Sequence, residues 1–452
     1  MTPKRWRPPA PESDMFSYYA RLALISLRNS PALTVLTVGA IALGIGVSLT
    51  VLSVYNLMSA DPIPQKSDVL YAVTLDSWDP ERPYRERDAT IPPYEMTFRD
   101  AVAVRDSDIP THAAAMFKAG FSVQPGNPDI RPFRVISRMT DRGLFAMFNL
   151  DFIYGDAWGA RADEGGEYVV VLNQTTNEKL FGGEDSVGER VRMGDNDFTV
   201  VGVVEDWNPT PKYYDVNNGA FDEGEEVFMP FALTEALELY SAGNTNCWKP
   251  EDIESYQNFI DSECVWIQYW AQLDDPAQRQ NYQQFLDDYA RNQQSVGRFQ
   301  RPLNNRLFPV MEWLEVRQVV ESDALIMLAI SFMFLAVCVF NTVGLLLARF
   351  ISRAPHIGIR RALGASRQAI FSQQMVEAAL VGTAAGALGI GLAWLGLQGV
   401  RVLYREVDRL TYLTPSMIVA GFAIALVAAL AAGLYPAWRV CRTSPSFYLR
   451  LQ

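Results

Sequence analysis

Histidine, cysteine and several enzyme motifs are scarce or missing in this 452-residue sequence, and each gap excludes a class of site. His112 and His356 are the only histidines, which excludes a histidine-based metal cluster or catalytic dyad. No G-x-x-x-x-G-K-[ST] phosphate loop occurs, so we expect no ATP binding by that device, and HExxH, CxxC and GxSxG are missing too. Four cysteines also make no disulfide-dense scaffold. We predict that the chain is not itself an enzyme and binds no cofactor or metal.

Charged side chains are missing from four long windows of 23 to 32 residues. A helix needs about 20 mostly apolar residues to cross a bilayer, so each window is long enough. A purely soluble protein is therefore excluded, although the mean hydropathy of the whole chain is only +0.01. A cleaved signal peptide is an alternative for the first window, which is about twice as long as a signal h-region. We predict transmembrane helices over 32–58, 324–348, 375–397 and 416–438.

The remaining charges are segregated by sign. Segment 60–323 carries 23 basic and 46 acidic residues, whereas 349–372 carries five basic and no acidic ones. Short loops rich in Lys and Arg stay in the cytoplasm. The expected topology places the N-terminal segment 1–31, the loop 349–374 and the tail 439–452 inside, and 60–323 and the loop 398–415 outside. This agrees with four spans, one before the large outer segment and three after it.

The outer segment mixes strand and helix patterns, which predicts an α+β domain of two subdomains. Apolar and β-branched runs predict strands over 69–75, 133–137, 168–172 and 198–204. Composition predicts helices over 93–105, 174–180 and 274–291. The polar stretch 205–265 is interpreted as loops or an insertion. In the N-terminal segment, apolar residues between 15 and 25 recur at helical spacing, which indicates an amphipathic helix on the inner membrane face or a simple extension of the first span.

Two cysteines, Cys247 and Cys264, lie in the outer segment, 17 positions apart. An oxidising compartment permits a disulfide between them, and two unrelated buried thiols are the alternative. The other two, Cys338 and Cys441, fall in the second span and the inner tail, where we expect reduced thiols.

Small residues and one acid stand out in the spans. Gly382 and Gly386 form a GxxxG step in the third span, which also contains Gly389, and Gly44 belongs to small residues of similar spacing in the first span. Such residues let helices approach closely, either within one bundle or at a dimer seam. Glu377 stands at the inner start of the third span, and an ionisable group there is a functional candidate by default. It could equally cap its helix or reach toward the headgroups.

The inner loop carries the most specific pattern, HIGIRRALGASR at 356–367, followed by Glu377-Ala378 in the next span. The tail adds GLYPAWR at 433–439 and then Ser444-Pro445, and the outer segment contains FTVVGVV at 198–204. With these motifs the chain resembles the FtsX-like, MacB-type (mechanotransmitting, type VII) ABC transporter permeases with a MacB-like periplasmic core domain. His356 departs from the family, which usually has Glu at that position.

The resemblance implies a permease in a bacterial inner membrane that couples ATP hydrolysis by a separate ABC ATPase to motion of the periplasmic domain. ATP and Mg would be bound by that partner, and the load would be a peptide, lipopeptide or antibiotic-like molecule. The ATPase-coupling residues that it implies are Ile357, Gly358, Arg360, Arg361, Leu363, Gly364 and Ala365. Their alternative role is only to hold topology and contact lipid headgroups.

Further implied partners are a second copy or a sister permease, the bilayer, a periplasmic adaptor and an outer-membrane channel. Nucleic acid is not an expected partner, since the basic strip is explained by topology. Two other functions stay open. One is a lipoprotein-extraction permease of the Lol kind, and the other is an FtsX-like signal transmitter that regulates cell-wall hydrolases without transport.

Overall fold

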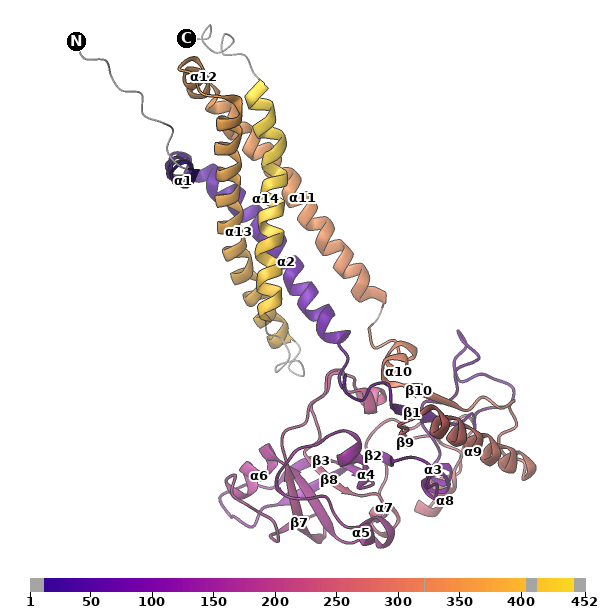
Figure 1. Cartoon of the computed structure of the whole chain (residues 1–452). Coiled ribbons are helices and arrows are strands. Elements are labelled where there is room, and N and C mark those ends of the chain that lie inside the picture. The colour runs from indigo at the N-terminus through magenta and orange to yellow at the C-terminus, as the bar shows by residue number, and fades with distance from the viewer. Residues whose placement is uncertain (1–11, 321, 404–412, 443–452) are drawn as a thin grey trace, which may run out of the picture. The chain divides into compact units, whose positions relative to one another are not determined.

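The computed structural model describes residues 12–320, 322–403 and 413–442. The chain divides into two compact units, which are described separately (Figure 1). The helical unit comprises Met1–Leu57 and Glu321–Gln452, and the α/β unit comprises Met58–Val320. Three expected features lie wholly or partly outside the described residues: the first basic residues of segment 1–31, positions 404–412 of the outer loop 398–415, and Ser444-Pro445 in the tail.

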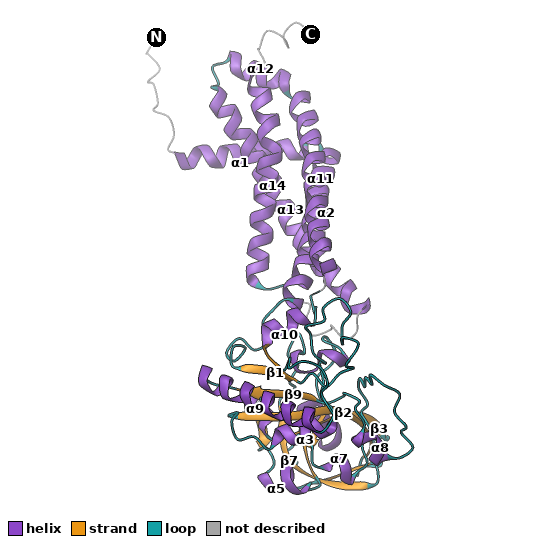
Figure 2. Cartoon of the chain, turned by 90° about the vertical axis from the view of Figure 1, so that its right-hand side faces the viewer, coloured by secondary structure: helices purple, strands orange, loops and turns teal. Residues whose placement is uncertain are grey.

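The helical unit contains two short helices and four long apolar ones that could each cross a membrane, among the residues that the structure describes. The short helices are α1 (Glu12–Arg28) and α12 (Ala354–Ala362). The long helices are α2 (Pro31–Met58), α11 (Ser322–Ser352), α13 (Arg367–Leu403) and α14 (Pro415–Arg442). Figure 2 shows α1 lying across the long helices.

Most of the predicted inner loop 349–374 is helical in the structure. The last turn of α11 reaches Ser352, α12 follows, and α13 already begins at Arg367. The Ser366 hydroxyl accepts a hydrogen bond from the backbone N–H of Ala369 at 3.1 Å, which caps the start of α13. Hydropathy detects the apolar part of a helix and misses the polar turns before it.

The α/β unit is built on one ten-stranded sheet, with strand order β10-β1-β9-β2-β3-β8-β5-β7-β4, and β6 pairs with β2 and β7. The strands are β1 (Leu70–Thr74), β2 (His112–Gln124), β3 (Phe133–Thr140), β4 (Phe152–Gly155), β5 (Val169–Asn173), β6 (Arg190–Met193), β7 (Asn196–Val204), β8 (Val227–Pro230), β9 (Gln268–Gln272) and β10 (Arg306–Pro309). Most pairs are antiparallel, but β3–β8 and β5–β7 are parallel.

Helices cover both faces of this sheet (Figure 2). They are α3 (Phe98–Arg105), α4 (Gly143–Met147), α5 (Ala160–Gly165), α6 (Gln174–Phe181), the 3-10 helix η1 (Tyr213–Asn218), α7 (Leu233–Ala236), α8 (Tyr256–Asp261), α9 (Pro276–Ser295) and α10 (Val310–Val316). Successive side chains of a strand point to opposite faces. In β2, Phe117 therefore packs in a core with α3 and α9, and Met116 packs in a second core with α4, η1 and α10.

Four predicted strands are confirmed as β1, β3, β5 and β7, and the predicted helices over 174–180 and 274–291 are α6 and α9. The helix predicted over 93–105 begins only at Phe98, because the Thr97 side chain caps it by accepting from Asp100 N. The expectation of two subdomains differs from the structure, in which one sheet joins all the strands into one compact unit.

The interpretation of 205–265 as loops or an insertion is also corrected by the structure. This stretch supplies β8, which lies between β3 and β5 in the sheet, and it supplies η1 to one core. All four residues of β8 are buried. This apolar run is too short to stand out within a long polar segment, and only its pairing with distant strands makes it part of the sheet.

Candidate functional site

The motif of the inner loop forms α12 and the turn after it, at one end of the helical bundle beside the last turns of α14 (Figures 1 and 2). Pro355 lies in the first turn of α12, where its missing N–H costs no hydrogen bond. The helix ends in a Schellman motif, in which Gly364 N donates to Arg361 O at 3.1 Å and Ala365 N donates to Arg360 O at 3.0 Å. Gly364 has φ +103°, so this turn needs glycine.

The apolar residues of α12 divide into an anchored part and an uncovered part. Ile357 is buried in a core that Leu346, Phe350, Ile370 and Val440 share, and Ala365 packs against the same core. Ile359 is 46% exposed and Leu363 is 83% exposed. Gly358 is buried, with no atom near the place where a Cβ would stand. The side chain of His356 lies outside the described part of the chain.

The two predicted coupling arginines are engaged within the chain. Arg360 Nη1 donates to Gln373 Oε1 in α13, and Arg361 Nη1 donates to the Cys441 carbonyl in α14 at 3.4 Å. Cys441 in turn points its thiol at the Arg367 carbonyl, 3.7 Å away. These contacts tie α12 to the beginning of α13 and the end of α14.

Glu377 lies in a buried ionic cluster at the same end of the bundle. Its Oε1 is 3.0 Å from Arg349 Nε, and its Oε2 accepts a hydrogen bond of 2.6 Å from Ser26 Oγ. Arg353, the residue before α12, approaches the same carboxylate at 3.5 Å. The sequence singles out Glu377. It does not identify Ser26, Arg349 or Arg353 as the partners of that carboxylate. One signal was available: Glu377 is the only acidic residue between 324 and 405, and a buried carboxylate needs a positive partner.

The predicted packing glycines lie at contacts between helices of this one chain. A Cβ on Gly382 or Gly386 would meet α14, at 2.8 Å from Ala429 Cβ and 2.9 Å from Phe422 Cδ1 respectively. A Cβ on Gly389 would stand 3.0 Å from Ile45 in α2, and one on Gly44 would stand 2.8 Å from Leu335 in α11. The four glycines thus allow close approach within the bundle.

Cys247 and Cys264 are joined by a disulfide in the α/β unit. Beside it, Asn246 and Val265 exchange backbone hydrogen bonds of 3.0 and 2.8 Å. Cys338 and Cys441 are free and buried.

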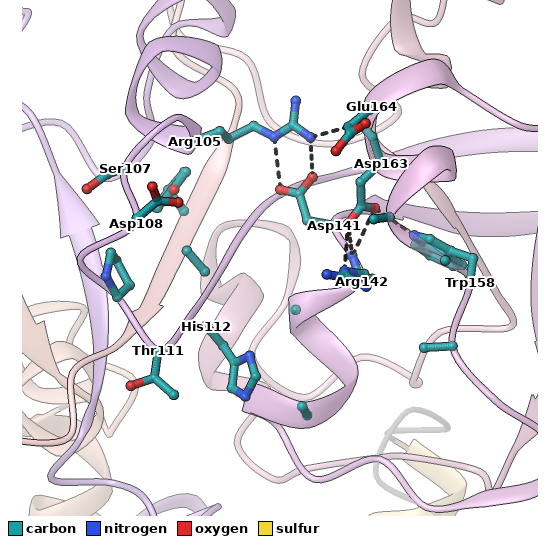
Figure 3. A pocket seen from close by; sticks show the side chains of 18 of the residues that line it. Arg105, Ser107, Asp108, Thr111, His112, Asp141, Arg142, Trp158, Asp163 and Glu164 are labelled. Carbon is teal, nitrogen blue, oxygen red and sulfur yellow. Dashed lines mark hydrogen bonds and ion pairs between the residues drawn. The ribbon is translucent and has the colours of Figure 1, made fainter.

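The α/β unit also contains an open polar groove of about 890 Å³ (Figure 3). Its lining includes the ion pair of Arg105 and Asp141, with two N–O contacts of 2.5 and 3.2 Å. Burial raises the pKa of Asp141 to about 6, against the opposing attraction of Arg105. Beside it, Asp163 accepts a 2.6 Å hydrogen bond from Trp158 Nε1, and burial raises its pKa as well.

The groove is more acidic than basic. Its lining carboxylates are Asp108, Asp141, Asp156, Asp163 and Glu164, and its cations are Arg105 and Arg142. His112 lines the groove too. Its burial lowers its pKa, and the positive charge of Lys66 lowers it further, which favours the neutral imidazole. Among the described residues no group of three or more His, Cys, Asp or Glu side chains could hold a metal ion. The charged side chains that line the groove can bind a ligand by charge and hydrogen bonds.

Two family profiles match the chain. The profile of the MacB-like periplasmic core domain matches residues 34–289, and that of the FtsX-like permease C-terminal region matches residues 328–445.

Individual relatives are more distant in sequence. Over 426 residues the chain is 24% identical to the macrolide export ATP-binding/permease protein MacB of Azoarcus sp. (strain BH72), covering 94% of this chain and 58% of that protein. It is 23% identical over 351 residues to the pyoverdine export ATP-binding/permease protein PvdT of Pseudomonas entomophila (strain L48), covering 77% and 48%. The chain spans about half the length of the curated relatives that it matches. Among solved structures, the periplasmic region of MacB from Actinobacillus actinomycetemcomitans is similar to it at a TM-score of 0.36 and 12% identity, covering 57% of this chain and 96% of that one.

Proposed function

This chain belongs to the FtsX/MacB-type permease family, and we propose that it is the permease subunit of an ABC-type exporter driven by a separate ATPase. The export permeases among its relatives support the first part. The match to the FtsX-like permease region supports the second, and ATP and Mg would then be bound by the partner. Membership in the family also favours an inner-membrane location with both termini cytoplasmic.

The observation that carries the coupling proposal is the arrangement of α12. Ile359 in α12 and Leu363 directly after it are uncovered and offer an apolar contact, and exposed apolar patches mark sites of contact with proteins or membranes. The other side of α12 is fixed to the bundle by Ile357, and its arginines reach α13 and α14. A displacement of α12 by a closing ATPase would therefore pass directly to the membrane-spanning helices.

The remaining parts of the machine are proposed from the family alone. Four spans make a small conduit, so a second permease protomer, identical or a sister chain, would complete it. A periplasmic adaptor and an outer-membrane channel would carry the load outward.

We place the capture of the load in the groove of the α/β unit. Its volume of about 890 Å³ is in the range of ligand pockets, and its excess of carboxylates favours loads that carry positive charge. Replacing the exposed Glu164 by Gln is expected to lower export of a cationic load several-fold with unchanged ATPase stimulation. Equal export of cationic and neutral loads by wild type and variant would contradict this placement.

The coupling proposal is tested on the full chain purified from native membranes, so that the ATPase that comes with it is identified. Leu363→Asp puts a charge into the proposed contact and is expected to lower retention of that ATPase and its stimulation by at least tenfold. Leu303→Asp is the matched control, since Leu303 is 40% exposed in the α/β unit and should have no effect. Normal ATPase binding and export with Leu363→Asp would contradict the role of α12.

A further inference from the structure

We propose that Glu377 is a positioning residue that makes α1 move together with α12 during coupling. The inference rests on the proposed function, and its structural basis is a cluster of Ser26, Arg349, Arg353 and Glu377, called the inner clamp below. The inner clamp joins three helices and the residue before α12 through one carboxylate.

Glu377 uses both carboxylate oxygens to hold different elements. Oε2 accepts from Ser26 Oγ in α1 at 2.6 Å, and Oε1 lies 3.0 Å from Arg349 Nε at the end of α11. The same Oε1 lies 3.5 Å from Arg353 Nη1, and Arg353 is the N-terminal cap residue of α12. No element of this set can shift by much without breaking a contact to a charge.

The arginines close the cluster from the other side. Arg349 Nη2 donates to the Ser26 carbonyl at 3.0 Å, and Arg353 Nη2 donates to the same carbonyl. Arg353 also donates to Ser30 Oγ at 3.1 Å. Ser26 lies in the last turn of α1, where carbonyl groups lack partners within the helix and favour cations. The inner clamp thus grips the side chain and the backbone of α1 at its C-terminal end.

Burial makes the contacts among Ser26, Arg349 and Glu377 persistent, and the Arg353 side chain beside them is 23% exposed. Arg349 is 0% exposed, Glu377 1% and Ser26 9%. Removing one partner of a buried ion pair leaves a charge without compensation, whereas an exposed pair exchanges readily with water. The inner clamp is therefore a fixed joint, unlike a pair of surface charges.

The surface of α1 outside the inner clamp suits a helix that can move along the membrane. The buried residues Tyr19, Ala23 and Ser26 recur at helical spacing on one side, and Tyr18, Leu24 and Ile25 are each at least 50% exposed. In a membrane protein such an uncovered apolar surface on a helix that lies across the spans suits the lipid interface. Since Arg353 immediately precedes α12, a push on α12 reaches α1 through the inner clamp and shifts it along the membrane surface.

The test uses spin labels on the full chain in lipid nanodiscs, at Tyr18→Cys in α1 and Gln368→Cys at the start of α13, both exposed positions. The two free native thiols are buried and the other two cysteines form the disulfide. Without ATPase, the wild-type clamp should give one narrow distance distribution. Glu377→Gln should broaden it at least twofold, and Ser26→Ala, which removes one hydrogen bond, should broaden it less. Equal widths in all three proteins would overturn the inner clamp.

A second arm adds the co-purified ATPase and nucleotide. In the wild type we expect the distance between the labels to change. In Glu377→Gln we expect the affinity for the ATPase to stay within twofold of the wild type and the stimulation of ATP hydrolysis to fall at least fivefold. Glu377→Asp, which keeps the carboxylate but shortens the side chain, should retain more of the narrow distance and of the stimulation than Glu377→Gln, a ranking that a general loss of packing would not produce. Stimulation by Glu377→Gln at the wild-type level would overturn the proposal. A wild type that neither binds nor stimulates the ATPase would instead overturn the proposed function. The distance distributions measured without ATPase would still show whether the inner clamp exists.

Discussion

At the scale of single residues, Arg138 is the centre of a fully buried charge cluster in the α/β unit. Its guanidinium contacts Glu225 Oε1 at 2.6 Å and also Asp215, and Lys212 Nζ lies 2.8 Å from the same Glu225 oxygen. Burial alone would raise the pKa of Glu225, but Arg138 and Lys212 hold it below its ordinary value. The cluster ties β3 to the segment 205–265, which the sequence suggested to be loops or an insertion.

Arg138→Met should therefore destabilise the α/β unit strongly, because two buried carboxylates would each lose one cationic partner, with only Lys212 left beside Glu225 and Lys118 left 3.6 Å from Asp215. Breaking a buried ion pair costs about 3–5 kcal/mol. Urea unfolding of the full chain, followed by tryptophan fluorescence, measures this loss. Arg192→Met is the control, since the Arg192–Asp197 pair is about half exposed and should contribute less than about 1 kcal/mol. Equal losses for both variants would contradict the importance of burial.

Glu95 is a second buried residue with an altered titration. It is 1% exposed, and its oxygens accept from Gln268 Nε2 at 2.5 Å and Asn244 Nδ2 at 3.0 Å. Burial raises its pKa to about 7, and Asp215 adds to that shift. The folded state therefore holds a proton that the unfolded state has released between about pH 4.5 and 7. Stability from this group is thus lost as the pH rises through that window.

Glu95→Gln, which cannot ionise, should remove this dependence. At pH 5 the two proteins should unfold with similar free energies, and at pH 8 the variant should be more stable by about 3 kcal/mol. Denaturant titrations of both full chains at several pH values give the difference, in which other titrating groups cancel. A difference that stays constant from pH 5 to 8 would show that Glu95 is already charged in the folded protein at low pH.

The residue scale also shows where sequence reasoning stops. Glu377 stood out because it is an acid at a membrane edge, whereas its partner Ser26 lies 351 positions away and carries no signal of its own. Arg138 and Glu225 are 87 positions apart and look like ordinary surface charges in the sequence. Such pairs exist only because the fold brings distant segments together.

At the scale of elements, α13 and α14 approach each other along a seam that needs glycine. A Cβ on Gly382 would stand 3.1 Å from the Ala425 carbonyl oxygen as well as 2.8 Å from Ala429 Cβ. Backbone cannot move aside as a flexible side chain can, so Gly382→Leu should separate the two helices. We expect a lower thermal midpoint in detergent and at least a fivefold loss of ATPase stimulation.

Gly391 supplies the matched control for this prediction. It lies in the same helix, and a Cβ added there would meet no described atom within 4 Å, so Gly391→Leu should fold and function like the wild type. Equal effects of the two substitutions would mean that helix propensity or lipid contact, and not the seam, determines the outcome.

Elements with a strong local pattern were predicted well, and those that depend on pairing were not. The four apolar windows correspond to the long helices, and the run FTVVGVV corresponds to β7. The longest strand, β2, was missed because its sequence HAAAMFKAGFSVQ contains small and charged residues and no clear alternation. It becomes a strand through its pairing with β3, β6 and β9, which no local pattern encodes.

At the scale of the whole molecule, the segregation of basic and acidic residues predicts the membrane topology. The segment 60–323, with twice as many acidic as basic residues, is flanked by segments in which basic residues dominate. Lys and Arg in short loops resist translocation, so the α/β unit and α12 should lie on opposite sides of the membrane. The proposed coupling depends on this, because an ATPase can reach α12 only from the cytoplasm.

Single cysteines at two exposed positions test this arrangement in the intact chain. Val296, in the α/β unit, is 70% exposed, and Leu363, after α12, is 83% exposed. A membrane-impermeant maleimide should label Val296→Cys in intact spheroplasts and Leu363→Cys only after the membrane is opened. The native cysteines give little background, since two are buried and two form a disulfide. Labelling of Leu363→Cys from outside would place α12 beyond the reach of any cytoplasmic ATPase, and the coupling proposal would then fail together with the topology on which it depends.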